Sequence, residues 1–202
     1  FTVLAPDDNA FATFLNGAAL GDVPTDVLSQ VLLNHVISGA ISSTDLVGLG
    51  NGYTNSSATG AGSNPMSIYF NTDDGVVFNG ISEVMVADVV GTNGIIHAMD
   101  AVIGLPTVVT FAVADPTFST LVSALTELTP ETDFVSVLST TNGTDPAPFT
   151  VFAPTNDAFA ALDAIPGETV LTQVLLHHVV GGLNIQSGNL QAGDNPAPTL
   201  QG

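Results

Sequence analysis

The stretch Phe1–Ala12, FTVLAPDDNAFA, returns 148 residues later as Phe149–Ala160, FTVFAPTNDAFA. Eight of its twelve positions are identical between the two copies. In each copy, β-branched and aromatic residues favour a strand, and the Ala-Pro that follows ends the strand because proline cannot donate to a sheet. The Asp, Asn and Thr side chains after the proline are typical helix N-caps. The repeat therefore predicts two copies of a strand, a sharp turn and a capped helix, about one domain apart.

A second repeated pattern is an apolar helical face that ends in a histidine. Its residues in the first copy are Val27, Leu28, Val31, Leu32 and His35, and in the second Val170, Leu171, Val174, Leu175 and His178. This spacing predicts an amphipathic helix, and a histidine in that position is more often a hydrogen-bonded core residue than a base. We therefore expect His35 and His178 to be buried and structural. His177 precedes His178, but adjacent helical residues diverge in direction, which argues against a metal pair.

Three motifs stand in one order and resemble the signatures of the fasciclin domain. FTVFAPTN at 149–156 resembles the first signature, and NGIIHAMD at 93–100, which contains His97, resembles the second. The segments around Asn34-His35 and His177-His178 resemble the tyrosine–histidine signature, where the family usually has Tyr before His. That region has been linked to integrin binding in the family, so the replacement of Tyr by Asn34 and His177 puts this activity in question. The resemblance implies an α+β fold, with tandem domains that are each a small β-wedge flanked by short helices.

The segments between the motifs divide the chain into two domains, 1–105 and 106–202. We expect a Gly/Ser/Asn-rich loop at 48–65, strands at 66–70, 76–78 and 81–90, and an apolar connection at 107–114. Two helices at 116–125 and 134–138 and a polar loop at 140–148 follow. The first domain lacks the helices that precede the first signature in the family, and the second lacks the hairpins and second signature. The chain therefore reads as a window of a longer tandem array, or as one of several chains that complete each other's domains. The apolar connection predicts a rigid or semi-rigid rod.

The composition is unusual because the chain has no Lys and no Arg, with a formal net charge of −19. An ordinary chain is about 25% charged. Two explanations stay open: the compositional bias of a secreted, repetitive protein, or a functional selection, either against proteases that cut after Lys or Arg or for calcium-bridged or acid-triggered association. Without a side-chain cation, nucleic-acid binding is excluded and anionic membrane surfaces are disfavoured. Divalent cations are expected only as counter-ions.

No pattern in the sequence predicts catalysis, a cofactor or a metal centre. The chain has no cysteine, no Gly-Xaa-Ser-Xaa-Gly elbow and no phosphate-binding loop. The acidic pairs at 7–8 and 73–74 lack the calcium-loop pattern and are interpreted as caps and turns. Asn55 and Asn142 match the glycosylation sequon and fall in predicted loops.

The resemblance implies an extracellular or cell-surface adhesion or matrix module that acts through protein–protein contacts, either with protein partners or with copies of itself. The first alternative is a structural subunit of a self-assembling extracellular filament. A weaker alternative is a small-ligand binder or enzyme that uses a groove near the histidine-ended helix. We expect no enzymatic activity, because the sequence offers no convergent titrating groups.

Overall fold

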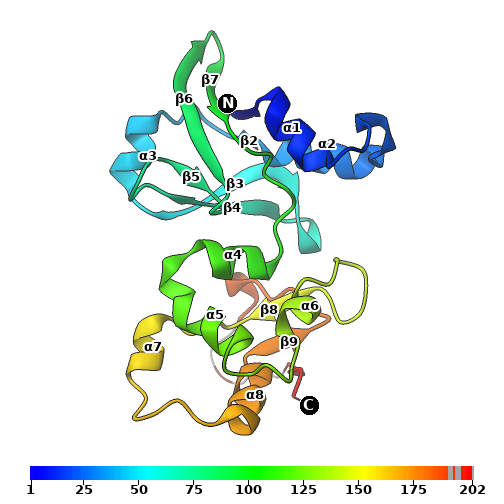
Figure 1. Ribbon diagram of the computed structural model, residues 1–202, viewed down its shortest axis with the longest axis vertical. Coiled ribbons are helices and arrows are strands. Elements are labelled where there is room, and N and C mark those ends of the chain that lie inside the picture. The colour runs from blue at the N-terminus through cyan, green and yellow to red at the C-terminus, as the bar shows by residue number, and fades with distance from the viewer. Residues whose placement is uncertain (191–192, 194–196, 202) are drawn as a thin grey trace. The chain divides into compact units, whose positions relative to one another are not determined.

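The computed structural model describes residues 1–190, 193 and 197–201 (Figure 1). The chain divides into two compact units, unit 1 from Phe1 to Pro106 and unit 2 from Thr107 to Gly202. The division falls one residue after the boundary expected from the sequence, and the expected end of the second domain at residue 202 lies outside the described residues.

Unit 1 is a closed barrel with three helices. Its strands are β1 (Thr2–Pro6), β2 (Val36–Ile37), β3 (Gly52–Thr59), β4 (Pro65–Asn71), β5 (Val77–Phe78), β6 (Ser82–Gly91) and β7 (Gly94–Met99), and its helices are α1 (Asp8–Leu15), α2 (Thr25–Asn34) and α3 (Ser43–Leu49). The strands pair in sequence order, and the barrel closes through a parallel pairing of β1 with β7. Its core is formed by Leu4, Ile37, Leu46, Ile68, Phe70, Val76, Phe78, Met99 and Ile103.

Strand β3 corrects the loop predicted at 48–65. Gly, Ser and Asn favour turns, but β3 lies between β2 and β4 and gains ladder hydrogen bonds on both sides. Its side chains alternate as a strand requires, with Asn55 exposed and the small residues Ser56 and Ala58 buried. Tertiary pairing therefore overrides the local preference of this segment.

Unit 2 has more residues in helices than in strands. It comprises α4 (Val108–Ala114), α5 (Ser119–Thr126), α6 (Phe134–Leu138), β8 (Phe149–Val151), α7 (Asn156–Ala160), α8 (Glu168–His177) and β9 (Val179–Gly181). Among the described residues its sheet has two strands, the antiparallel pair β8 and β9. Its core is formed by Leu121, Ala124, Phe134, Phe159, Leu171 and Leu175.

Helix α4 (Val108–Ala114) occupies the segment predicted as an apolar connection at 107–114, for which no helix was expected. Its β-branched residues are poor helix formers, but the N–H of Thr107 donates to Thr110 Oγ1 at 3.1 Å and caps the first turn. The helix also packs on α5 and α6. The cap and the packing together outweigh the local propensity.

No single helix among the described residues is long and apolar enough to cross a membrane. The bent pair Val108–Ala114 and Pro116–Thr126, with 96° between its halves, meets the length and composition criteria when both halves are counted together.

Candidate interaction surfaces

The strand-turn-helix repeat folds the same way in both units, and we call residues 1–41 and 149–185 the repeated module. In unit 1 the N–H of Leu4 donates to the carbonyl of His35 at 2.9 Å. In unit 2 the N–H of Phe152 donates to the carbonyl of His178, also at 2.9 Å. The strand pairings share one register as well, because Val3 lies opposite Val36 and Val151 opposite Val179.

A threonine hydroxyl closes the corner of each module. Thr2 donates to the carbonyl of Gly39 at 2.9 Å and accepts the N–H two residues further on at 2.8 Å. Thr150 donates to the carbonyl of Leu183 at 2.9 Å and accepts the N–H of Ile185 at 2.8 Å. The internal geometry of the module is therefore set by its own sequence and is the same in both surroundings.

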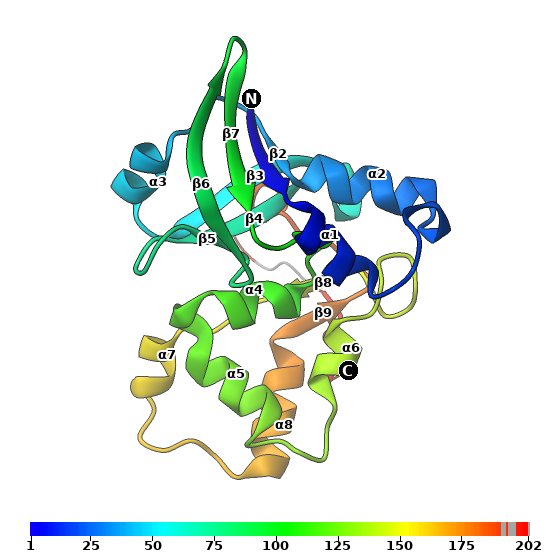
Figure 2. The ribbon, with the colours of Figure 1, turned by 45° about the horizontal axis from the view of Figure 1, so that its top comes forward.

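In unit 1 the barrel closes the inner face of the module's strand and leaves its outer face partly exposed. Leu4 points into the barrel core and is fully buried. Strands β6, β7, β1 and β2 lie side by side in the barrel (Figure 2). On their outer face, neighbouring strands pair at Val89, Ile96, Val3 and Val36, and we call these four residues the outer stripe. Val89 is 47% exposed and Ile96 is 41% exposed. A hollow of about 300 Å³ lies over part of the stripe.

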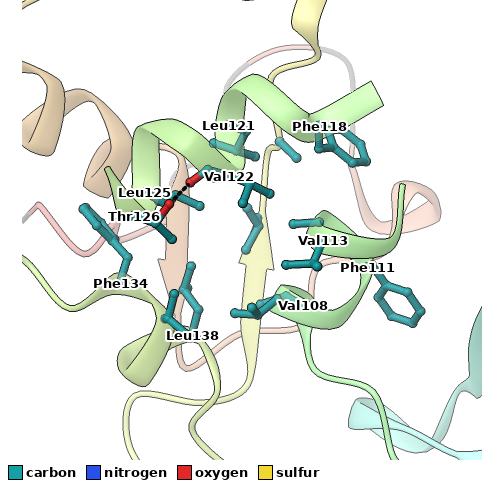
Figure 3. Close-up of a pocket in the computed structure, with 15 residues that line it drawn as sticks. Val108, Phe111, Val113, Phe118, Leu121, Val122, Leu125, Thr126, Phe134 and Leu138 are labelled. Carbon is teal, nitrogen blue, oxygen red and sulfur yellow. Dashed lines mark hydrogen bonds between the residues drawn. The ribbon is translucent and has the colours of Figure 1, made fainter. Parts of the chain in front are cut away.

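In unit 2 the coverage of the strand is reversed. Phe152, the counterpart of Leu4, is 49% exposed. Val151 and Ala153, on the other face of the strand, line an apolar groove of about 210 Å³ whose walls are α4, α5 and α6 (Figure 3). Thr126 has the only polar side chain among the lining residues, and its hydroxyl already donates to the carbonyl of Val122 at 2.8 Å. The groove therefore presents apolar surface and no charge.

The histidine-ended helix shows the same reversal. Val31 of α2 is buried against Ala10 and Val102, whereas its counterpart Val174 in α8 is 42% exposed. Conversely, Leu175 of α8 is buried in the unit 2 core, whereas its counterpart Leu32 in α2 is 47% exposed. Each copy of the helix therefore buries the side that packs against other elements of its own unit.

His35 is buried, as predicted, and both of its ring nitrogens are occupied. Its Nδ1–H donates to the carbonyl of Val31 at 2.7 Å, and its Nε2 accepts the N–H of Ile103 at 2.9 Å. Burial lowers the pKa of His35, against a smaller opposing effect of the bond to Val31. The imidazole is therefore a neutral link between α2 and the segment after β7, with no nitrogen left to act as a base.

Asn34 is also buried and structural. Its amide group donates to the carbonyl of Gly104 at 3.0 Å, and its Oδ1 accepts the hydroxyl of Ser56 at 2.8 Å. The side chain that stands in place of the family's tyrosine thus joins α2 to β3 and to the segment after β7. It lies inside the unit and offers no contact to a partner.

The burial predicted for His178 is wrong in degree, because this residue is only half-buried. Its Nδ1 does bond the carbonyl of Val174 at 2.7 Å, which matches the bond made by His35. The segment 102–104 that covers the ring of His35 has no counterpart on α8 among the described residues. His177, at the end of α8, is exposed and takes no part in the core.

His97 lies in a polar cluster that does not have the geometry of a catalytic site. It is fully buried; its Nε2–H donates to the carbonyl of Ile41 at 2.9 Å, and its Nδ1 accepts the N–H of Asp88 at 3.2 Å. The Asp88 carboxylate accepts the N–H and the hydroxyl of Ser43, at 2.8 and 2.5 Å, and these bonds lower its pKa. Both nitrogens of His97 are engaged by the backbone, so the imidazole does not face the hydroxyl of Ser43, and the lowered pKa of Asp88 makes this carboxylate a weaker base than usual.

The remaining candidates are caps, turns and surface positions. Asp7 caps α1 by accepting the N–H of Ala10 at 2.7 Å, and Asp73 accepts side-chain amides within a turn. In the part of the chain that the structure describes, no group of three His, Cys, Asp or Glu could hold a metal ion. Asn142 is exposed in a turn, as expected, whereas Asn55 is exposed on a strand.

The sequence reading did not identify the outer stripe or the groove. Their signal is present in the repeat itself, since Val3 and Val151 are corresponding positions. Ile95 and Ile96 are also apolar in succession, so the strand carries an apolar residue on each face. What the sequence does not provide is which face each unit covers.

Comparison with known proteins gives a matching family and related sequences. The fasciclin domain matches residues 1–106 and 116–202. Protein sll1483 of Synechocystis sp. (strain ATCC 27184 / PCC 6803 / Kazusa) is 42% identical over 96 residues, which are 44% of this chain and 48% of that protein. The uncharacterized protein sll1735 of the same strain is 42% identical over 86 residues, 39% of this chain and 56% of that protein. The chain thus spans about half the length of these curated relatives.

Among solved structures, a FAS1 domain pair from the insect cell adhesion molecule fasciclin I is similar with a TM-score of 0.53 and 21% identity. The match covers 98% of this chain and 72% of that chain, and it shows a shared fold. The repeated module, the barrel with its parallel closing strands and the matched residues lead to one conclusion: the chain belongs to the fasciclin domain family.

Proposed function

We propose that this chain is a protein-interaction module of the adhesion or matrix type that acts outside the cell or at its surface. Membership of the fasciclin family supports a general role in protein–protein contacts, and the similar insect domain pair comes from a cell adhesion molecule. The site geometry favours contact over turnover, because the buried histidines His35 and His97 have both ring nitrogens hydrogen-bonded.

The observation that carries the proposal is the bare apolar face that each unit presents. Unit 1 exposes Val89 and Ile96 on the outer stripe, and unit 2 exposes Phe152 on the strand face opposite its groove. Contiguous apolar surface on a soluble domain is typical of protein interaction sites. The absence of Lys and Arg means that such contacts rely on burial of apolar groups and on hydrogen bonds rather than on cationic side chains.

A second candidate, a subunit of a self-assembling filament, is favoured by a specific observation. The strand face that is buried in the barrel at Leu4 is exposed in unit 2 at Phe152, and the opposite face, which lies on the outside of the barrel at Val3, is lined by helices in unit 2 at Val151. Complementary faces on two parts of one chain are the requirement for head-to-tail association, which grows into open fibres when the contact does not close on itself.

Cell attachment to surfaces coated with the purified chain tests the first candidate. We expect attachment that is lost when the cells are first treated with protease, since the partner is a protein. Ile96→Thr on the outer stripe reduces attachment, whereas Ile81→Thr, at a 57% exposed isoleucine outside the stripe, leaves it unchanged.

Sedimentation velocity and electron microscopy of the same preparation test the second candidate, since polymers from the purified chain alone support a filament. A monomer that attaches no cells would contradict both candidates.

A further inference from the structure

Asparagine followed directly by glycine occurs five times in the chain, at Asn16, Asn51, Asn79, Asn93 and Asn142. In such a pair the glycine nitrogen can attack the asparagine side chain, because glycine has no Cβ that obstructs the approach. We propose that Asn142, in the loop between α6 and β8 (Figure 1), is a site of spontaneous deamidation, and that the fold protects the pairs whose asparagine it holds. This modification is independent of the proposed function.

The reaction needs no reagent other than water. The backbone nitrogen of Gly143 forms a bond to Cγ of Asn142, the Cγ–Nδ2 bond breaks, and ammonia leaves with the proton that the glycine nitrogen gives up. Water then opens the resulting cyclic succinimide. Attack at Cγ gives aspartate, and attack at the main-chain carbonyl gives isoaspartate. The net change replaces the side-chain NH2 by OH, and the new carboxyl group is ionised at neutral pH.

Asn142 lies in an exposed turn that leaves its side chain unrestrained. The turn is closed by the N–H of Thr144, which donates to the carbonyl of Thr141 at 3.0 Å. Among the residues that the structure describes, neither the side chain of Asn142 nor the N–H of Gly143 has a hydrogen-bond partner. Apart from the chain neighbours of Gly143, no heavy atom lies within 4 Å of the place that a Cβ on this glycine would occupy, so the tetrahedral intermediate has room.

Two other asparagines are held by hydrogen bonds. Asn79 is 3% exposed, its N–H donates to the carbonyl of Tyr69, and its Oδ1 accepts the N–H of Tyr69, both at 2.9 Å. Asn51 is exposed, but its Oδ1 accepts the N–H of Thr72 at 2.8 Å and its Nδ2 donates to Asp73 at 3.0 Å. Because Cγ can turn toward the glycine nitrogen only after such bonds break, both pairs should react about tenfold or more slowly than Asn142.

The remaining two pairs are held through the backbone. Asn16 ends α1 in the left-handed conformation, and its N–H donates to the carbonyls of Ala12 and Thr13, both at 3.2 Å. Asn93 precedes Gly94, which lies in the ladder of β6 and β7. In each pair one side of the reacting bond is fixed while the asparagine side chain is exposed, so we expect rates between those of Asn142 and Asn79.

Deamidation at Asn142 has two consequences for unit 2. It adds a negative charge to a chain that already has a net charge of −19 and contains no Lys or Arg. It also removes the nitrogen of the sequon Asn142-Gly143-Thr144 to which a glycan would be attached, so that glycosylation and deamidation of this residue exclude each other.

The test incubates the unglycosylated 202-residue chain in mildly alkaline buffer, which favours loss of the glycine proton. Samples taken over time are digested under mildly acidic conditions with a protease that cuts after glutamate. The fragment 132–168 contains Asn142 and no other Asn-Gly pair, and the fragment 84–127 does the same for Asn93. Mass spectrometry follows the replacement of NH2 by OH in each fragment and locates it by fragmentation. A methyltransferase specific for isoaspartate should label the fragment 132–168 first.

Variants and an unfolded reference separate the effect of the fold from that of the local sequence. Asn142→Gln should remove the early mass change in the fragment 132–168. Asp73→Ala removes one of the two bonds that hold the side chain of Asn51 and should speed deamidation there by about fivefold or more. In urea, where these bonds are lost, the lead of Asn142 over Asn51 and Asn79 should fall below about threefold.

Three results would overturn the proposal. In the folded chain, another Asn-Gly pair could react before Asn142. Unfolding could leave the relative rates of the five pairs unchanged. Asn142 could also keep its amide over a period in which the unfolded chain reacts. The readout is the mass of the chain itself, so cell attachment and assembly can fail or succeed without affecting this result.

Discussion

In unit 1 the strand of the repeated module lies in the wall of a barrel, whereas in unit 2 the matching strand lies beneath helices. Leu4 is buried and its counterpart Phe152 is half exposed, while Val151 faces the helical groove and its half-buried counterpart Val3 lies on the outer stripe. The hydrogen bonds inside the module are nevertheless the same. The comparison teaches that the module holds its shape by local bonds, and that the surrounding elements decide which of its faces forms a core.

The largest expected difference between the two copies is at the inner face of the strand. Leu4→Ala should lower the free energy of unfolding of unit 1 by about 2–5 kcal/mol, because it leaves a cavity in the barrel. Phe152→Ala should cost unit 2 less than about 1 kcal/mol, because the ring is 49% exposed. Both tyrosines of the chain, Tyr53 and Tyr69, lie in unit 1, so tyrosine fluorescence in urea follows that unit alone. Hydrogen exchange reports on unit 2, and equal costs in the two units would break the comparison.

The helix gives a smaller difference of opposite sign. Leu175→Ala in α8 should destabilise unit 2 by about 2–4 kcal/mol, since the side chain is buried among helices. Leu32→Ala in α2 should cost unit 1 less than about 1 kcal/mol, since that side chain is 47% exposed. The measurement is amide hydrogen exchange across both units. If Leu32→Ala proved as costly as Leu175→Ala, α2 would have a cover that the structure does not contain.

The paired histidines give the next difference. His35→Ala strands the buried N–H of Ile103 and should cost about 1–3 kcal/mol. His178→Ala removes one bond to Val174 at a half-buried position and should cost about 1 kcal/mol or less. Urea denaturation of unit 1 and hydrogen exchange of unit 2 measure the two values. A larger loss at His178 than at His35 would contradict the assignment of His35 as the link to the segment after β7.

The smallest expected effect is the pH dependence that His35 gives to the stability of unit 1. Burial lowers the pKa of His35 below its usual 6.5. Below pH 6.5 the unfolded chain therefore binds a proton that the folded unit does not, so this contribution to stability is full above pH 6.5 and is lost as the pH falls toward the folded pKa. Urea midpoints at pH 7.5 and pH 5.5 should show this loss in the wild-type chain. His35→Gln should flatten the profile, and an unchanged slope would assign the effect to other groups.

The sequence predicted the module well because the information is local. The cap at Asp7 and the apolar spacing of α2 and α8 each act within a few residues, whereas β1 runs through the Ala5-Pro6 pair that was expected to end it. It failed at β3 and α4, where tertiary pairing and packing override Gly, Ser and β-branched preferences. It also gave His35 and His178 the same burial, because identical motifs carry no information about what covers them.

The threonine-closed corner of the module has a consequence for synthesis. Its long-range bonds span 39 residues in unit 1 and 35 in unit 2, so each module can close soon after its own residues leave the ribosome. In unit 1 the covering strands β3 to β7 are translated after the module, whereas in unit 2 the helices α4 to α6 are translated before it. In the nascent chain Leu4 therefore stays exposed to solvent until strands β3 to β7 have been translated and have closed the barrel. Later it exposes the apolar faces of α5 and α6 until Val151 and Leu175 have been translated and can pack on them. The apolar surface that chaperones can bind therefore changes from strand to helix as translation proceeds.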